Sequence, residues 1–221
     1  MKRFGFLYEK VVSVDNCRLA ILNASQNKRK RKMVKDVCDN LEDYAKDLSE
    51  RLSRMDFLSP YKTRFIKDGL SGKERELQIP AFYPDQCAHH AIMQVLKPII
   101  ERSSYHWSCA NIPKRGIDHA SKGVERATVR DRKHAKYCVK MDISKFYPSI
   151  PHGKLKARLR EKIKDEKFLQ IIFKVIDSNK GFPSETTPRL GWQSCTCNRW
   201  TILSSRSTES DTMSDMLTIW Y

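Results

Sequence analysis

The segment Tyr137–Ile150, YCVKMDISKFYPSI, is the feature that most limits what this chain can form. Apolar and polar residues alternate along its first half: Val139, Met141 and Ile143 share one face, and Lys140, Asp142 and Ser144 share the other. A period of two predicts a β-strand. Pro148 and Pro151 close it, because proline cannot donate a hydrogen bond to a neighbouring strand. An aspartate therefore ends an otherwise apolar strand, and the aromatic pair Phe146 and Tyr147 follows it.

A carboxylate at the end of a rigid strand suits a magnesium ion. Mg²⁺ prefers oxygen ligands and keeps coordination positions for substrate phosphates. On its own, however, Asp142 is more simply interpreted as a solvated surface aspartate, so the neighbouring pattern has to decide.

The remaining elements follow from hydrophobic spacing. Apolar residues recur every three or four positions from Val34 to Leu52, which predicts amphipathic helix. The other expected elements are strands over 63–66 and 76–79 joined by a turn, helices over 84–100 and 119–130, a basic helix from Lys154, and an apolar helix over 168–176.

Charge points to a polyanionic partner. The 42 Lys and Arg residues outnumber the 26 Asp and Glu residues, a formal net charge of +16. Nucleic acid is the first candidate and an anionic membrane surface the second, because cations that neutralise phosphates release counterions. The basic run Lys28–Lys32, KRKRK, either contacts phosphates or forms a solvated face.

The cysteines and the lack of long apolar stretches favour a location inside a cell. The 7 cysteines are an odd number without a zinc-type CxxC pair, which favours free thiols. No stretch approaches the roughly 18 to 20 apolar residues of a membrane span, and the start lacks the apolar core of a signal peptide. We therefore expect a cytoplasmic protein, with nucleic acid and not a membrane as its partner.

The segment Lys140–Ile150, KMDISKFYPSI, resembles the first palm motif of the reverse transcriptases. The resemblance implies that Asp142 binds both catalytic Mg²⁺ ions and that the Ile143 carbonyl helps to hold one. It also implies that Tyr147, beside Phe146, lies under the sugar of the incoming nucleotide.

Two upstream segments are similar to motifs of the same family. Arg75–Pro80, RELQIP, followed by Asp85, is similar to the fingers motif whose arginine grips the triphosphate, and Lys73 lies beside it. Ile112–Gly116, IPKRG, is similar to the next fingers loop, in which Lys114 and Arg115 would touch template and nucleotide. Without the resemblance, Arg75 is a strand-edge charge and Arg115 a loop cation.

The resemblance implies an α+β fold, a right-hand polymerase with fingers and a partial palm behind an N-terminal helical region. The expected divisions are a basic helical region over 1–60, fingers over 61–135, the first half of a palm over 136–180, and an unpatterned tail over 181–221. The implied activity is RNA-templated DNA synthesis from dNTPs on an RNA template and DNA primer, by two-metal nucleotidyl transfer with Mg²⁺. Bacterial, phage and retroelement reverse transcriptases share this activity.

The tail departs from the family pattern after Gly181–Pro183. It lacks the Tyr-x-Asp-Asp motif that supplies the other catalytic carboxylates. If codons began on the third base of each present codon, Ser210–Tyr221 could encode RHYVRYVDDMV, which contains that motif. We therefore expect a truncated, inactive reverse transcriptase with a frameshift near Lys180. The alternatives are a non-catalytic nucleic-acid-binding protein and a degraded remnant of an interrupted gene.

Overall fold

The computed structural model of this chain describes residues 3–67, 74–102, 106, 109, 115–130, 137–141, 150–178 and 216–220. The chain divides into two compact units. Unit 1 comprises Met1–Ile99 and Tyr147–Arg189, and unit 2 comprises Ile100–Phe146 and Leu190–Tyr221. Each is described by itself.

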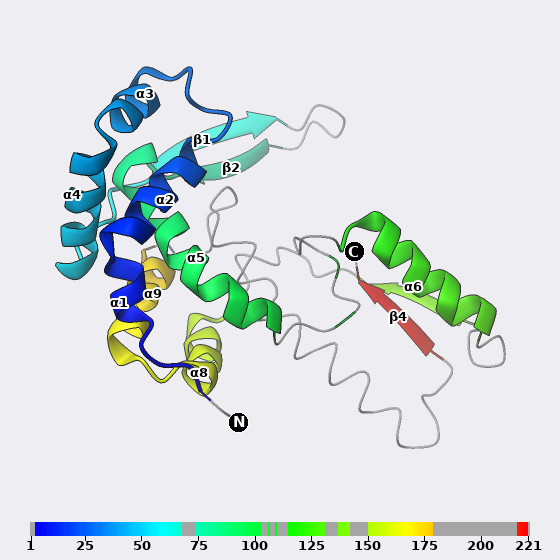
Figure 1. The fold of residues 1–221 in the computed structure, drawn as a ribbon. Helices are drawn as coiled ribbons and strands as arrows, with labels where there is room; N and C mark the ends of the chain where they lie inside the picture. The colour runs from blue at the N-terminus through cyan, green and yellow to red at the C-terminus, as the bar shows by residue number, and fades with distance from the viewer. Residues whose placement is uncertain are drawn as a thin grey trace. The chain divides into compact units, whose positions relative to one another are not determined.

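Helices dominate unit 1 (Figure 1). Its elements are α1 (Tyr8–Val12), α2 (Val14–Ser25), α3 (Lys32–Asp39), α4 (Leu41–Ser53), β1 (Lys62–Lys67), β2 (Glu74–Ile79), the π-helical turn η1 (Phe82–Gln86), α5 (Cys87–Arg102, whose end lies in unit 2), α8 (His152–Lys162) and α9 (Glu166–Asp177). Unit 2 contains α6 (Ile117–Arg130), β3 (Tyr137–Met141) and β4 (Met216–Trp220).

Helix-on-helix packing forms the core of unit 1. Helices α2 and α4 pack together, and α1 contacts α2, α4 and α9. Their buried residues recur at helical spacing: Cys17, Ala20, Ile21 and Ala24 on α2, and Ala45, Leu48 and Leu52 on α4. Each large apolar side chain buried in this way contributes about 1.5–3 kcal/mol. The helical period of the sequence thus builds a core without a sheet.

Asp165 joins the N-terminal ends of α1 and α9. Its carboxylate accepts hydrogen bonds from the backbone N–H groups of Leu7 and Tyr8, both at 2.8 Å, and from that of Phe168 at 3.2 Å. Burial acts to raise the pKa of Asp165, but these backbone donors outweigh it and hold the pKa below its ordinary value. One side chain therefore fixes two segments far apart in sequence.

Most of the expected secondary-structure elements are confirmed. The strands expected over 63–66 and 76–79 lie within β1 and β2, and the helices expected over 119–130 and 168–176 lie within α6 and α9. The apolar period from Val34 to Leu52 is split between α3 and α4 at Asn40, whose φ of −111° and ψ of 40° are not helical.

The expected fold class is wrong. The described residues are mostly helical, and their strands form only two-stranded sheets, so they do not form the α+β fingers and partial palm of a right-hand polymerase. Strand β3 pairs with β4 in parallel. The physical reason lies in the hydrophobic pattern: most apolar residues recur at helical spacing and bury one another between helices. Among the described residues, no helix is both long and apolar enough to cross a membrane.

His89 on α5 is a polar side chain inside this apolar core. It is 1% exposed, and neither ring nitrogen has a hydrogen-bond partner. Burial, aided by the nearby His90, lowers the pKa of His89 to about 3. The imidazole is therefore neutral in the folded chain even in mild acid.

We expect the substitution His89→Leu to reduce the acid sensitivity of the fold. The unfolded imidazole has a pKa near 6.5 and the folded one near 3, so the stability present above pH 6.5 is lost as the pH falls through this window. Urea unfolding at pH 7 and pH 5 should show the native chain losing about 2 kcal/mol more than the variant. Parallel losses in the two proteins would contradict this account.

Candidate nucleic-acid interface

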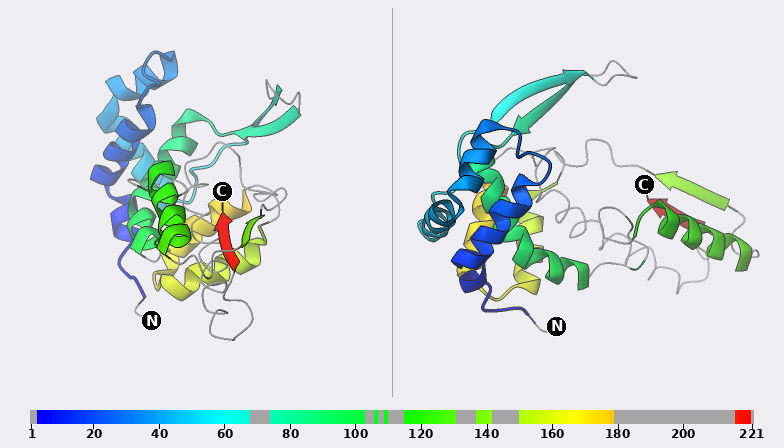
Figure 2. Two further views of the ribbon diagram at one scale, coloured as in Figure 1. Left: turned by 90° about the vertical axis from the view of Figure 1, so that its right-hand side faces the viewer. Right: turned by 45° about the horizontal axis from the view of Figure 1, so that its top comes forward.

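The β1–β2 hairpin extends beyond the helices of unit 1 (Figures 1 and 2). The strands are antiparallel, in register from Lys62 opposite Ile79 to Lys67 opposite Glu74. Across the strands, the Gln78 amide donates to the Thr63 hydroxyl at 3.2 Å. A two-stranded hairpin is marginally stable alone, so its position depends on how its ends are held.

One face of the hairpin carries three basic positions. Side chains on a strand alternate between faces, and the register places Arg75 opposite Ile66. Position 75 therefore shares a face with positions 62 and 64. We name Lys62, Arg64 and Arg75 the basic face; Lys62 and Arg64 are exposed.

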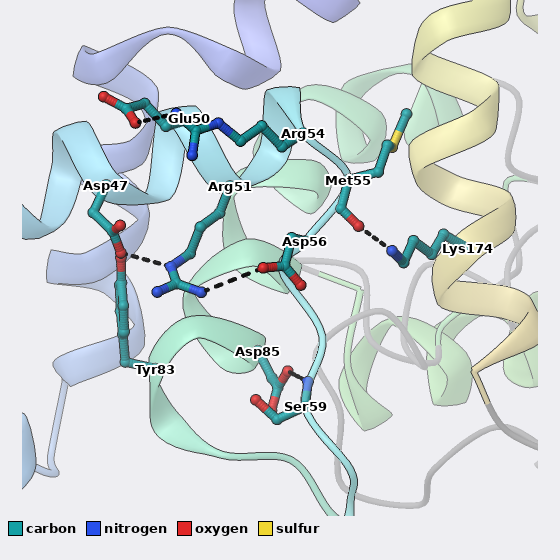
Figure 3. A network of polar contacts seen from close by, with 10 residues as sticks. All are labelled: Asp47, Glu50, Arg51, Arg54, Met55, Asp56, Ser59, Tyr83, Asp85 and Lys174. Atoms are coloured by element: carbon teal, nitrogen blue, oxygen red, sulfur yellow. Dashed lines mark hydrogen bonds and ion pairs between the residues drawn. The ribbon is translucent and has the colours of Figure 1, made fainter.

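Asp85 holds both ends of the hairpin. This side chain is 0% exposed, and its carboxylate accepts from the N–H of Ser59 at 2.6 Å and from the N–H of Ala81 at 3.0 Å. Figure 3 shows the bond to Ser59. Ser59 precedes β1 and Ala81 follows β2, so one carboxylate fixes the entry and the exit of the hairpin. Burial raises the pKa of Asp85, although the two N–H groups act in the opposite direction.

Gln86 connects the basic run to the end of the hairpin, at Pro80. Its amide nitrogen donates to the Pro80 carbonyl at 3.0 Å, and its amide oxygen accepts from Lys28 Nζ at 2.8 Å. Burial, together with the charge of Arg31, lowers the pKa of Lys28. The other four residues of the basic run, Arg29, Lys30, Arg31 and Lys32, are exposed. The first lysine thus anchors the run beside the hairpin.

A polar network centred on Asp47 of α4 also holds η1 (Figure 3). Arg51 donates to Asp47 at 2.7 Å, and the Tyr83 hydroxyl donates to the same carboxylate. The Tyr83 ring packs edge-on against Tyr44, with centroids 4.8 Å apart. Burial raises the pKa of Tyr83, and the bond to Asp47 acts in the same direction. The turn that carries Asp85 is therefore held rigidly against α4.

The structure places some of the expected site residues and not others. Arg75 lies in β2 of unit 1, and Arg115 lies just before α6 in unit 2. The remaining expected residues lie outside the described residues: Lys73, Lys114, Asp142, Ile143, Phe146 and Tyr147. Strand β3 ends at Met141, the residue before Asp142.

Lys62 and Arg64 were not among the expected site residues. They share a face with position 75 only in the register that the structure gives, with Arg75 opposite Ile66. The part of the chain that the structure describes contains no group of three or more His, Cys, Asp or Glu side chains placed to hold a metal ion.

Comparison with known proteins gives one partial similarity. No family model matches the chain. Protein YkfC from Escherichia coli (strain K12) is 27% identical over 107 residues, which is 48% of this chain and 28% of YkfC. The match therefore spans less than a third of the length of YkfC.

Substituting Asp85 by alanine should destabilise unit 1 by about 2–3 kcal/mol, because two N–H groups at the hairpin ends would lose their acceptor. Asp85→Asn should cost less, since one acceptor oxygen remains. Urea unfolding measures the loss, and trypsin should cleave the hairpin faster in the alanine variant. Asp39→Ala, which removes an exposed carboxylate on α3, is the matched control and should change stability by less than about 0.5 kcal/mol. Equal stability of Asp85→Ala and the control would disprove the clamp.

Proposed function

We propose that this chain is a reverse transcriptase-like protein, and that as printed it binds nucleic acid without completing a catalytic site. The observation that carries the proposal is the order of three motif-like segments along the chain: Arg75–Pro80, Ile112–Gly116 and Lys140–Ile150. The proposal rests on these segments and on the charge, and not on the fold class.

The geometry of the hairpin supports this reading of the first segment. Arg75–Ile79 lies in β2, and Asp85 clamps the backbone directly after Pro80. The planar guanidinium of an arginine matches the geometry of phosphate oxygens. Lys62 and Arg64 add positive charge to the same face.

The remaining roles follow the resemblance. Asp142 and the Ile143 carbonyl would hold Mg²⁺, which neutralises charge on the phosphates when bound. Lys73 would assist Arg75, Phe146 and Tyr147 would lie under the sugar, and Lys114 with Arg115 would contact the template. The chain lacks Tyr-x-Asp-Asp, so the second pair of carboxylates is missing from its sequence. We place the protein in the cytoplasm.

A non-catalytic nucleic-acid-binding protein is the second candidate. The basic face and the exposed part of the basic run favour it, because phosphate contacts need only positive charge. The two candidates differ in what a restored frame after Lys180 would produce: a reverse transcriptase would then extend a primer and need the Asp142 carboxylate, whereas a binding protein would not extend it.

Primer extension on an RNA template with Mg²⁺ tests the proposal. We expect no extension by the printed chain, extension when the frame is restored after Lys180, and none when Asp142→Asn is added to the restored chain. Asp142-dependent extension by the printed chain would show that its own tail completes the site. Failure of the restored chain to extend would reject the reverse transcriptase assignment.

The double substitution Lys62→Gln and Arg64→Gln tests the basic face. Log affinity falls with log salt, and each lost phosphate contact makes this slope shallower by about 0.9. On a template–primer duplex, the slope of the double variant should therefore be shallower than that of the native chain by about 1.8. Fluorescence anisotropy at several salt concentrations measures it. The charge-matched control is Lys35→Gln with Lys46→Gln, two exposed lysines on α3 and α4. Equal slopes for the two double variants would show that binding does not use the basic face.

A further inference from the structure

A pocket of about 320 Å³ opens beside the N-terminal segment of unit 1. It lies where this segment meets the start of α9. Its lining combines two aromatic rings with two lysines and two carboxylates: Phe6, Tyr8, Lys164, Lys167, Glu9 and Asp165.

Phe6 is held in an exposed and strained conformation. Its side chain is 88% exposed and its φ is 57°. A non-glycine residue in this region is strained and persists only where the surroundings impose it. Here the chain is fixed on both sides of Phe6: Lys164 N–H donates to the Phe4 carbonyl at 2.7 Å, and Asp165 accepts from Leu7 and Tyr8. The backbone on both sides of the phenyl ring is therefore fixed, and the ring itself is exposed to solvent.

Cations lie beside the aromatic rings. Lys167 Nζ is 5.3 Å from the centroid of the Tyr8 ring, and Lys164 is exposed at the same pocket. The Asp165 carboxylate is already used by backbone N–H groups, so Glu9 is the carboxylate left to face a ligand. The lysine side of the pocket can thus hold an anion next to a flat ring.

We propose that this pocket binds one unpaired nucleotide of a single-stranded nucleic acid. The base stacks against Phe6 and Tyr8, and the adjoining phosphates contact Lys164 and Lys167. Aromatic rings interleaved with basic side chains form such sites, because every base has a flat face and every linkage a negative charge. The net charge of +16 favours this ligand over an apolar peptide. The inference rests on the proposed nucleic-acid binding and adds a site separate from the hairpin.

Binding of the full chain to a labelled single-stranded oligouridine tests the site by fluorescence anisotropy. Phe6→Leu should weaken binding about tenfold, the effect of losing one stacked base, without changing the salt slope. Phe6→Tyr, which keeps a ring, should stay within about threefold. Lys164→Gln with Lys167→Gln should reduce the salt slope by about 1.4, against no change for Lys35→Gln with Lys46→Gln.

Phe6→Gly separates binding from folding. Glycine adopts a φ of 57° without strain, so the variant should melt no lower than the native chain and still lose about tenfold in affinity. One outcome would overturn the pocket and leave the proposed function standing. In that outcome, Phe6→Gly and Phe6→Leu bind with native affinity, whereas the double variant of Lys62 and Arg64 binds more weakly. No binding of any nucleic acid by the native chain would overturn both. Phe6-dependent binding to anionic vesicles alone would assign the pocket to a membrane surface and overturn it as well.

Discussion

The Asp85 carboxylate is the constraint on which the hairpin depends. Burying a carboxylate is unfavourable unless donors replace its water, and here the N–H groups of Ser59 and Ala81 do so. Phe65, an apolar side chain of this hairpin, is 67% exposed and so contributes little burial to hold it. Its direction therefore comes from the two backbone segments that Asp85 ties together, and from the α4 network that holds η1.

Asp165 repeats this use of an acidic side chain at the other end of unit 1. It ties the N-terminal segment to α9, as Asp85 ties the strand ends to η1. Both carboxylates are largely occupied by backbone donors within the fold. The chain has 42 basic and 26 acidic residues. A carboxylate that binds backbone N–H groups does not pair with a surface cation, so more of these cations are available to a polyanion.

The sequence predicted local structure well and long-range structure poorly. Helical spacing located α6 and α9, and turn residues located the hairpin, because these patterns are local. The roles of Asp85 and Asp165 could not be predicted, since Ser59 is 26 positions from Asp85 and Leu7 is 158 positions from Asp165. The fold class was wrong because it was inferred from motif order, whereas the described strands pair only in twos. Of the candidate site, Arg75 was predicted from its motif and stays a prediction, whereas Lys62 and Arg64 required the register.

Binding and chemistry place different demands on this chain. Phosphate contacts depend on charge and on a rigid backbone, and the clamped hairpin meets both conditions whatever sequence follows Asp177. Nucleotidyl transfer needs several carboxylates held within a few tenths of an ångström, so the loss of one segment removes it. Under the proposed function, a change of frame near Lys180 would abolish catalysis and leave the sequence of the hairpin and of the N-terminal pocket unchanged. Nucleic-acid affinity without extension is the combination that this separation predicts.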